Sequence, residues 1–215
     1  NMEWHVYCLA TQPDGKILVG GGFYQVGSVE KRFIARLEAN GSLDTSFGAV
    51  VDHIVYGMAL QPDGRLLIVG TFSTVSNFYY SYAARLQSNG SVDSSFYCGL
   101  NGITECIALQ ADGKILIGGG FTSISGTTRN NFARLSTTGT LDATFNPDPN
   151  GTVHTLAVQA DGKVILGGDF TSLGGTAANY IARVNANGAL DSSFTPSANG
   201  TVQSLSVQAD GAVLV

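Results

Sequence analysis

A strict 49-residue repeat is the feature that most constrains the fold of this 215-residue chain. The Gln that opens each QPDG or QADG segment recurs at an unchanged interval, at Gln12, Gln61, Gln110, Gln159 and Gln208. The Phe that ends each LDxxF or VDxxF segment keeps the same interval, at Phe47, Phe96, Phe145 and Phe194. Because no insertion or deletion breaks this register, four complete copies and the start of a fifth predict a repeat architecture.

Each copy is predicted to form three or four short antiparallel strands. In copy four, residues 151–159 alternate small and large side chains and end at the turn residues 160–162, which is typical of a strand and a tight hairpin. Residues 163–170 are then the second strand and residues 180–186 the third. Residues 189–194 close the copy as a short outer strand or a turn. The pattern predicts an all-β fold, a β-propeller built from 49-residue blades.

We predict one repeat domain over residues 1–215, with copies at 4–52, 53–101, 102–150 and 151–199 and a partial copy at 200–215. The chain begins with Asn and ends within a strand pattern, so we expect it to be a fragment of a longer polypeptide. The start of the fifth copy could pair with the first copy and close a ring. Alternatively, a longer chain or a second subunit could complete the ring. Exposed sheet edges would otherwise invite association.

The first strand of each copy carries small residues on one face and large apolar residues on the other. The small face holds Cys8, Gly57, Cys106, Thr155 and Ser204, and the large face holds Leu9, Met58, Ile107, Leu156 and Leu205. A small face against a neighbour's large face lets sheets pack about 10 Å apart, so we expect both faces to be buried. Cys8 and Cys106 share one repeat position two copies apart, which disfavours a disulfide between them.

The motif QPDGKILVGGGF, followed by an ARL segment and the ending NGSLDTSF, resembles the delta-60 repeat family. The resemblance covers the whole chain and is best in copies three and four. Copies one and two depart from it in the loop between the second and third strands, which is YQVGSVEKR and STVSNFYYS. The resemblance implies a β-propeller of the kind found in large bacterial surface or secreted proteins and in phage proteins. It implies no catalytic residues.

Charge and motif content exclude several classes of function. The net charge is −5 and no cluster of Lys and Arg occurs, which argues against nucleic acid as a partner. No run of about 18 apolar residues occurs, so no membrane insertion is predicted. His5, His53 and His154 fall at three different repeat positions, each expected at a partly exposed strand end, so we predict neither a metal site nor a cofactor.

Charged residues that recur in every copy are predicted to build the blades. They are the turn aspartates Asp14, Asp63, Asp112 and Asp161, the arginines Arg36, Arg85, Arg134 and Arg183, and the aspartates Asp44, Asp93, Asp142 and Asp191. Half-buried charges need partners, so we expect each of these arginines to pair with the LD or VD aspartate of its own copy.

Residues that break the repeat symmetry are the candidates for function. In the loop between the second and third strands, copy two carries Phe78, Tyr79 and Tyr80, and copy one carries Tyr24, Lys31 and Arg32. Aromatic side chains with polar tips are enriched at binding surfaces. Sugar stacking, a protein contact and packing against a neighbouring domain are all compatible with this loop.

We therefore expect a noncatalytic binding or structural module of a bacterial surface or secreted protein or a phage virion. Its partners would be another protein, further repeats of the same polypeptide or a glycan. A lectin-like propeller that uses the aromatic loop of copy two is the alternative, and an enzyme acting on a polysaccharide in a central channel is a third class. The sequence contains no G-x-S-x-G, H-E-x-x-H or C-x-x-C motif.

Overall fold

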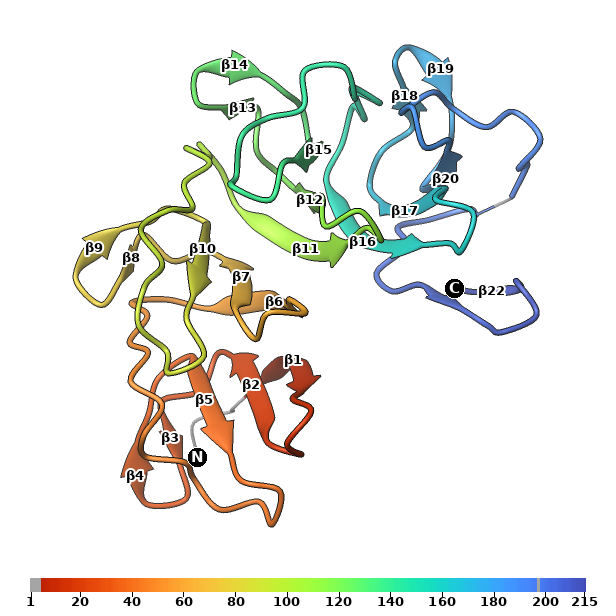
Figure 1. The fold of residues 1–215 in the computed structure, drawn as a ribbon. Helices are drawn as coiled ribbons and strands as arrows, with labels where there is room; N and C mark the ends of the chain where they lie inside the picture. Colours follow the sequence, from red (N-terminus) through yellow and green to blue (C-terminus); the bar gives the residue numbers. More distant parts are fainter. Residues whose placement is uncertain (1–4, 197) are drawn as a thin grey trace. The chain divides into compact units, whose positions relative to one another are not determined.

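The computed structural model describes residues 5–196 and 198–215, and these residues form strands, turns and loops without a helix (Figure 1). The chain divides into two compact units, unit 1 at Asn1–Gly99 and unit 2 at Leu100–Val215. Unit 1 covers copies one and two except for the last two residues of copy two, and unit 2 covers those two residues, copies three and four and the partial fifth. The predicted first copy begins at residue 4, which lies outside the described residues. The all-β prediction is confirmed.

Each repeat of unit 1 forms one three-stranded antiparallel sheet and one short hairpin. The first sheet consists of β1 (Val6–Thr11), β2 (Ile17–Gly21) and β5 (Ile34–Leu37), and the second of β6 (Val55–Leu60), β7 (Leu66–Gly70) and β10 (Ala83–Leu86). The hairpins are β3 (Gln25–Val26) with β4 (Val29–Glu30), and β8 (Thr74–Val75) with β9 (Phe78–Tyr79). β1 packs against β6, so the two sheets are neighbours within the unit.

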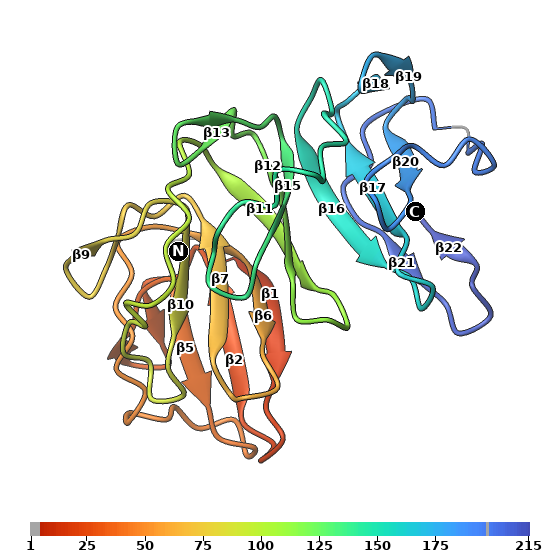
Figure 2. The same cartoon turned by 45° about the horizontal axis from the view of Figure 1, so that its top comes forward.

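Unit 2 repeats this arrangement. Its sheets consist of β11 (Thr104–Leu109), β12 (Ile115–Gly119) and β15 (Phe132–Leu135), and of β16 (Val153–Val158), β17 (Val164–Gly168) and β20 (Ile181–Val184). The short hairpins are β13 (Ser123–Ile124) with β14 (Thr127–Thr128), β18 (Ser172–Leu173) with β19 (Thr176–Ala177), and β21 (Ser206–Val207) with β22 (Val213–Leu214). β11 packs against β16, and Figure 2 shows the two sheets side by side.

The turn between the first and second strands is fixed by its Asp and Gly. Gly15 has φ of 83°, a left-handed conformation that Gly adopts at no steric cost. The Asp14 carboxylate accepts a hydrogen bond from the backbone N–H of Lys16, at 3.1 Å. The same bond recurs at Asp63, Asp112, Asp161 and Asp210. These aspartates are therefore turn residues, each bonding the backbone two residues ahead.

The last segment of each repeat forms one isolated β-bridge with the third strand and not a fourth strand. In repeat four the segment predicted as an outer strand or a turn contributes a single bridge, between Val184 and Leu190. The loop between the second and third strands instead contains a short hairpin of two two-residue strands, which the sequence pattern did not predict. Period-two alternation cannot reveal a strand of two residues, which explains the omission.

The second strand is the centre of each sheet and of each hydrophobic core. All five residues of β7, β12 and β17 are buried, because a neighbouring strand covers each edge and apolar residues cover both faces. In unit 1, Phe47 and Phe72 complete the core between the two sheets, and in unit 2 Phe145 and Phe170 do so. Burial of one such side chain contributes about 1.5–3 kcal/mol.

The first strand is less buried than predicted, because it is the edge strand of its sheet. In repeat one the small face is covered: the Cys8 thiol lies 3.9 Å from the Val55 carbonyl oxygen, and burial raises its pKa to about 12. The large face is not, since Leu9 is 63% exposed and no described sheet of unit 1 precedes it. In repeats three and four, Ile107 and Leu156 are half-buried, so the expectation of two buried faces is wrong.

Candidate binding surface

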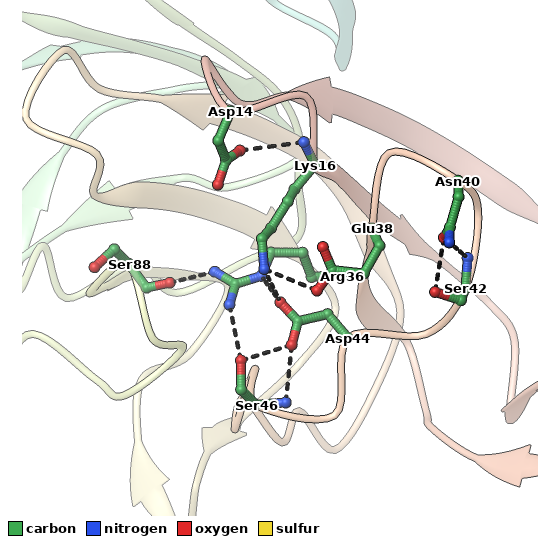
Figure 3. A network of polar contacts seen from close by, with 9 residues as sticks. All are labelled: Asp14, Lys16, Arg36, Glu38, Asn40, Ser42, Asp44, Ser46 and Ser88. Carbon is green, nitrogen blue, oxygen red and sulfur yellow. Dashed lines mark hydrogen bonds and ion pairs between the residues drawn. The ribbon is translucent and has the colours of Figure 1, made fainter.

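The recurring charges form one network per repeat, and the predicted ion pair between each arginine and its own aspartate is present. The Nε to carboxylate distances are 2.8 Å for Arg36–Asp44, 2.8 Å for Arg85–Asp93, 3.0 Å for Arg134–Asp142 and 2.9 Å for Arg183–Asp191. In repeat one Lys16 also bonds Asp44, at 2.8 Å, and Ser46 donates to the same carboxylate (Figure 3). Hydrogen bonds from Lys16, Ser46 and Arg36 hold the pKa of Asp44 well below its usual range.

Each arginine also connects elements that the sequence did not link. The guanidinium of Arg134 lies over the Phe145 ring, 4.1 Å from its centroid, and the other three arginines contact the corresponding Phe. Arg134 Nη1 donates to the carbonyl oxygen of Ala186 in repeat four, at 2.7 Å. Arg36 donates in the same way to Ser88 of repeat two. The network therefore fastens neighbouring sheets together and is structural.

The three residues of repeat one that were predicted to bind a partner all contact other residues of unit 1. Tyr24 packs edge-on against Phe33, with 5.3 Å between ring centroids, and Arg32 lies over the Tyr24 ring. Arg32 pairs with Glu30 at 2.7 Å. Lys31 Nζ donates to the carbonyl oxygens of Phe47 and Ala49, at 2.8 and 3.3 Å.

Arg129 occupies in repeat three the repeat position that Lys31 occupies in repeat one. There Arg129 is buried and donates to the carbonyl oxygen of Phe145 at 2.8 Å, as Lys31 does to that of Phe47. A cation at this position thus satisfies backbone carbonyls of its own repeat. We assign Lys31 to the framework rather than to a binding surface.

The aromatic residues of repeat two lie partly in solvent. Tyr79 is 84% exposed, and Phe78 and Tyr97 are each 63% exposed. Tyr80 is half-buried against the core and packs edge-on against Tyr97, with 6.4 Å between ring centroids. We define the aromatic patch as Phe78, Tyr79, Tyr80 and Tyr97. The sequence identified the first three members, and the tertiary fold adds Tyr97.

A second group that breaks the repeat symmetry was missed by the sequence pattern. His154, the second residue of β16, is partly exposed near a strand end as predicted, but its side-chain contacts were not predicted. Its Nδ1 lies 2.6 Å from the Glu105 carboxylate and its Nε2 lies 2.9 Å from that of Asp169. Burial acts to lower the pKa of His154, but the two carboxylate hydrogen bonds outweigh it and the pKa is raised. Glu105 and His154 occupy one repeat position, where repeats one and two carry tyrosines.

This His154 cluster predicts a pH-dependent contribution to stability. A raised folded-state pKa means that the contribution is fully present below the unfolded value of about 6.5 and is lost as pH rises through the folded value. We expect His154→Gln to lower the free energy of unfolding by about 1 kcal/mol at pH 6, because half-exposed pairs are screened, and to have little effect at pH 9. Urea denaturation of both proteins at the two pH values measures this.

The matched control is His53→Gln, which removes a ring that contacts Thr71 and Phe33 and no carboxylate. An equal loss at both pH values for His154→Gln would contradict the assignment.

The described residues contain neither a metal-binding cluster nor a membrane-spanning helix. Among residues 5–196 and 198–215, no group of three or more His, Cys, Asp or Glu side chains is arranged to hold a metal ion. Within the same ranges, no helix is long and apolar enough to cross a membrane.

Comparison with known structures supports the fold. The chain aligns over 96% of its length with a protein from B. thetaiotaomicron described as the extracellular domain of a one-component system, with a TM-score of 0.55 and 17% identity. It spans 24% of that protein. It also aligns over 97% of its length with a streptogramin B lyase, covering 74% of that chain, with a TM-score of 0.50 and 15% identity. At these identities the likeness concerns the fold alone.

Comparison of sequences identifies the family. No curated protein matches the sequence significantly. A family model described as a domain of unknown function (DUF5122) beta-propeller matches four segments, residues 12–47, 61–96, 110–145 and 159–194. Each segment runs from the Gln of the first turn to the Phe that stacks on the framework arginine. The chain therefore belongs to the DUF5122 beta-propeller family.

Proposed function

We propose that the chain is a noncatalytic binding scaffold, in which the repeated framework holds the sheets and the aromatic patch contacts a partner. The observation that carries this proposal is the exposure of Tyr79, Phe78 and Tyr97. Covering large exposed aromatic side chains with a partner is favourable, and the hydroxyl groups of the two tyrosines can also form hydrogen bonds to that partner. The framework arginines and aspartates are already engaged with one another, so they are poor candidates for reaction or binding.

A protein, or further repeats of the same polypeptide, is the partner that the patch favours. The Val50 carbonyl oxygen accepts a hydrogen bond from the backbone N–H of Ser76, which lies in the β8–β9 hairpin that carries Phe78 and Tyr79. Val50 is 61% exposed, so it adds exposed apolar surface close to this hairpin. Phe78 has no polar tip for a sugar. The alternative is a lectin-like propeller that stacks a sugar on Phe78, Tyr79 and Tyr80, and the exposure of Tyr79 is what favours it. A polysaccharide-acting enzyme is the third class.

We also propose that these repeats are delta-60 repeats and that the propeller works outside the cell, on a bacterial surface, in a secreted protein or in a phage virion. Support comes from the motif resemblance and from the fold similarity to a domain described as extracellular. Adhesion is then the biological role that best fits an exposed aromatic patch on a repeat scaffold.

The test uses a photo-crosslinking phenylalanine analogue at position 79 of the polypeptide that carries this chain, in the cells that make it. We expect a discrete protein adduct from position 79 and none from the exposed turn residue Asn187. The purified chain should compete the adduct away, and a Phe78→Ser, Tyr79→Ser chain should compete at least about tenfold less well. If position 79 gives no adduct, protein binding by the patch is wrong.

A glycan array tests the lectin alternative on the same surface. Saturable glycan binding by the chain that disappears in Tyr79→Ala, Tyr80→Ala would favour the lectin. Turnover of any polysaccharide would contradict the noncatalytic assignment.

A further inference from the structure

An open cleft of about 560 Å³ lies within unit 2 where repeat three meets repeat four. Four backbone segments form it: the loop after β12, the loop before β15, the segment before β16 and the β18–β19 hairpin. The polar side chains along it include Thr122, Asn130, Asn131, Asp148, Thr152 and Ser172. This volume falls in the range of about 300–1,000 Å³ that is usual for small-molecule sites.

The equivalent position in unit 1, where repeat one meets repeat two, is filled by three aromatic rings. Tyr24 packs on Phe33 with 5.3 Å between centroids, and Phe33 stacks on His53 at 5.8 Å. At the same three repeat positions, 98 residues later, unit 2 carries Thr122, Asn131 and Gly151. The cleft thus exists because small and polar residues replace the rings that fill its counterpart.

Asn131 is the clearest departure from the repeat. Its repeat position has a left-handed backbone in every copy, with φ of 63° at Phe33, 69° at Tyr82, 59° at Asn131 and 64° at Tyr180. The backbone conformation is therefore common to the four repeats, and three of them place an aromatic ring on it. Only the side chain differs in repeat three, where an amide stands in place of a ring and opens the cleft.

The amides of the cleft are held in fixed orientations. Asn131 Nδ2 donates to the Pro149 carbonyl oxygen at 2.8 Å, and Asn130 Nδ2 donates to Asp148 Oδ1 at 2.9 Å. These bonds leave the Oδ1 atoms of both amides and the Oδ2 of Asp148 without a donor among the described residues. Three oriented acceptors therefore lie beside the hydroxyls of Thr152 and Ser172, which can donate or accept.

The cleft suits an uncharged ligand. Asp148 is the one charged side chain along the described cleft, and the cation Arg129 lies near enough to offset it. Burial lowers the pKa of Arg129, and the charges of Asp148 and Asp142 act against that lowering. Arg129 is itself engaged with the Phe145 carbonyl, so no cation is available to pair with a ligand anion.

From this geometry we propose that the cleft between repeats three and four binds a neutral glycan residue. Sugar hydroxyls would donate to the Asn130, Asn131 and Asp148 oxygens and accept from Thr152 and Ser172. Gly151 lets the segment before β16 lie close to the backbone of Phe170, because a Cβ there would lie 2.9 Å from backbone atoms of Phe170. The site shares no residue with the aromatic patch, so the two proposals can fail separately.

The test measures binding of glucose, galactose, mannose and N-acetylglucosamine by saturation-transfer NMR. We expect saturable binding of at least one sugar with a dissociation constant of about 1 mM, as befits a ligand of this size. Asn131→Phe should weaken it at least about tenfold by filling the cleft. Thr152→Ile, which removes one hydroxyl and adds bulk, should weaken it several-fold.

Both variants use residues that this chain already carries at the same repeat positions, Phe33 for the first and Ile54 and Ile103 for the second. If Asn131→Phe fails to fold, Thr152→Ile alone decides. Tyr79→Ala is the control and should leave sugar binding unchanged.

Three results would overturn the proposal. One is the absence of binding for all four sugars up to about 50 mM. A second is sugar binding that survives Asn131→Phe and Thr152→Ile. The third is a melting temperature raised by calcium chloride alone and lost in Asn131→Phe, which would make the occupant a cation.

Discussion

Substituting Gly119 with Ala is expected to lower the free energy of unfolding of unit 2 by about 3 kcal/mol or more. Gly119 faces a β-bulge, where the register of β11 shifts between Thr104 and Cys106. Because Gly120 N–H donates to the Ile103 carbonyl at 2.9 Å, that carbonyl lies directly over the Gly119 Cα. A Cβ on Gly119 would collide with the Ile103 oxygen and lie 2.7 Å from the Thr104 Cα. Backbone atoms on both sides leave no flexible group to yield.

The neighbouring glycine provides the control. A Cβ on Gly120 would lie 3.7 Å from the Thr152 hydroxyl, an ordinary contact, and repeats two and four carry Thr71 and Asp169 at this position. Gly120→Ala should therefore change stability by less than about 1 kcal/mol. Urea denaturation of the two variants beside the parent chain measures both. Equal effects would show that the bulge does not have the geometry described.

Substituting Asp93 with Ala is expected to cost about 3 kcal/mol in unit 1. Asp93 accepts from Arg85 Nε at 2.8 Å and from Arg65 Nη1 at 2.9 Å, and it also accepts from Ser95. The Arg85 side chain is only 4% exposed, so removing the carboxylate takes away an ion pair of 2.8 Å from a buried cation. Breaking a buried pair in this way costs more than the pair contributes, since the remaining charge is still desolvated.

Asp63 is the matched control, because it also pairs with Arg65, at 2.9 Å, but is 46% exposed. Asp63→Ala should cost no more than about 1 kcal/mol. Acid titration adds a second measurement: burial acts to raise the pKa of Asp93, but bonds from Ser95, Arg65 and Arg85 lower it overall. Its contribution is therefore present above pH of about 4 and lost below it. Asp93→Ala should lose less stability on acidification than the parent chain, and an equal loss would contradict the network.

The sequence predicted the framework well because the framework repeats. The Asp-Gly turn, the three strands and the pairing of Arg134 with Asp142 are local, and four aligned copies make such local patterns unambiguous. The partial exposure of the first strand was not predictable, because it depends on whether a neighbouring sheet covers its outer face. Leu9 and Leu156 both lie in edge strands, but β11 packs against the strand of Leu156 while no described sheet of unit 1 precedes Leu9, which lies in solvent.

The symmetry-breaking residues were harder to interpret, because their partners come from other segments. Lys31 resembled a surface charge until the fold placed it on the Phe47 carbonyl. His154 lies near a strand end as predicted, but its contact with Glu105, which occupies the same repeat position one copy earlier, was not predicted. Comparing the copies position by position would have singled out Asn131, which stands where the other repeats have Phe or Tyr. The cleft itself depends on side chains brought together from two repeats.

Hydrogen exchange followed by mass spectrometry tests most directly whether one sheet design is built four times. The account predicts that backbone amides of β2, β7, β12 and β17 exchange slowest in their own repeats, because each is the central strand of a buried sheet. The Asp-Gly turns beside them should exchange fastest. A second strand that exchanges as quickly as its adjacent turn, in any of the four repeats, would contradict the account.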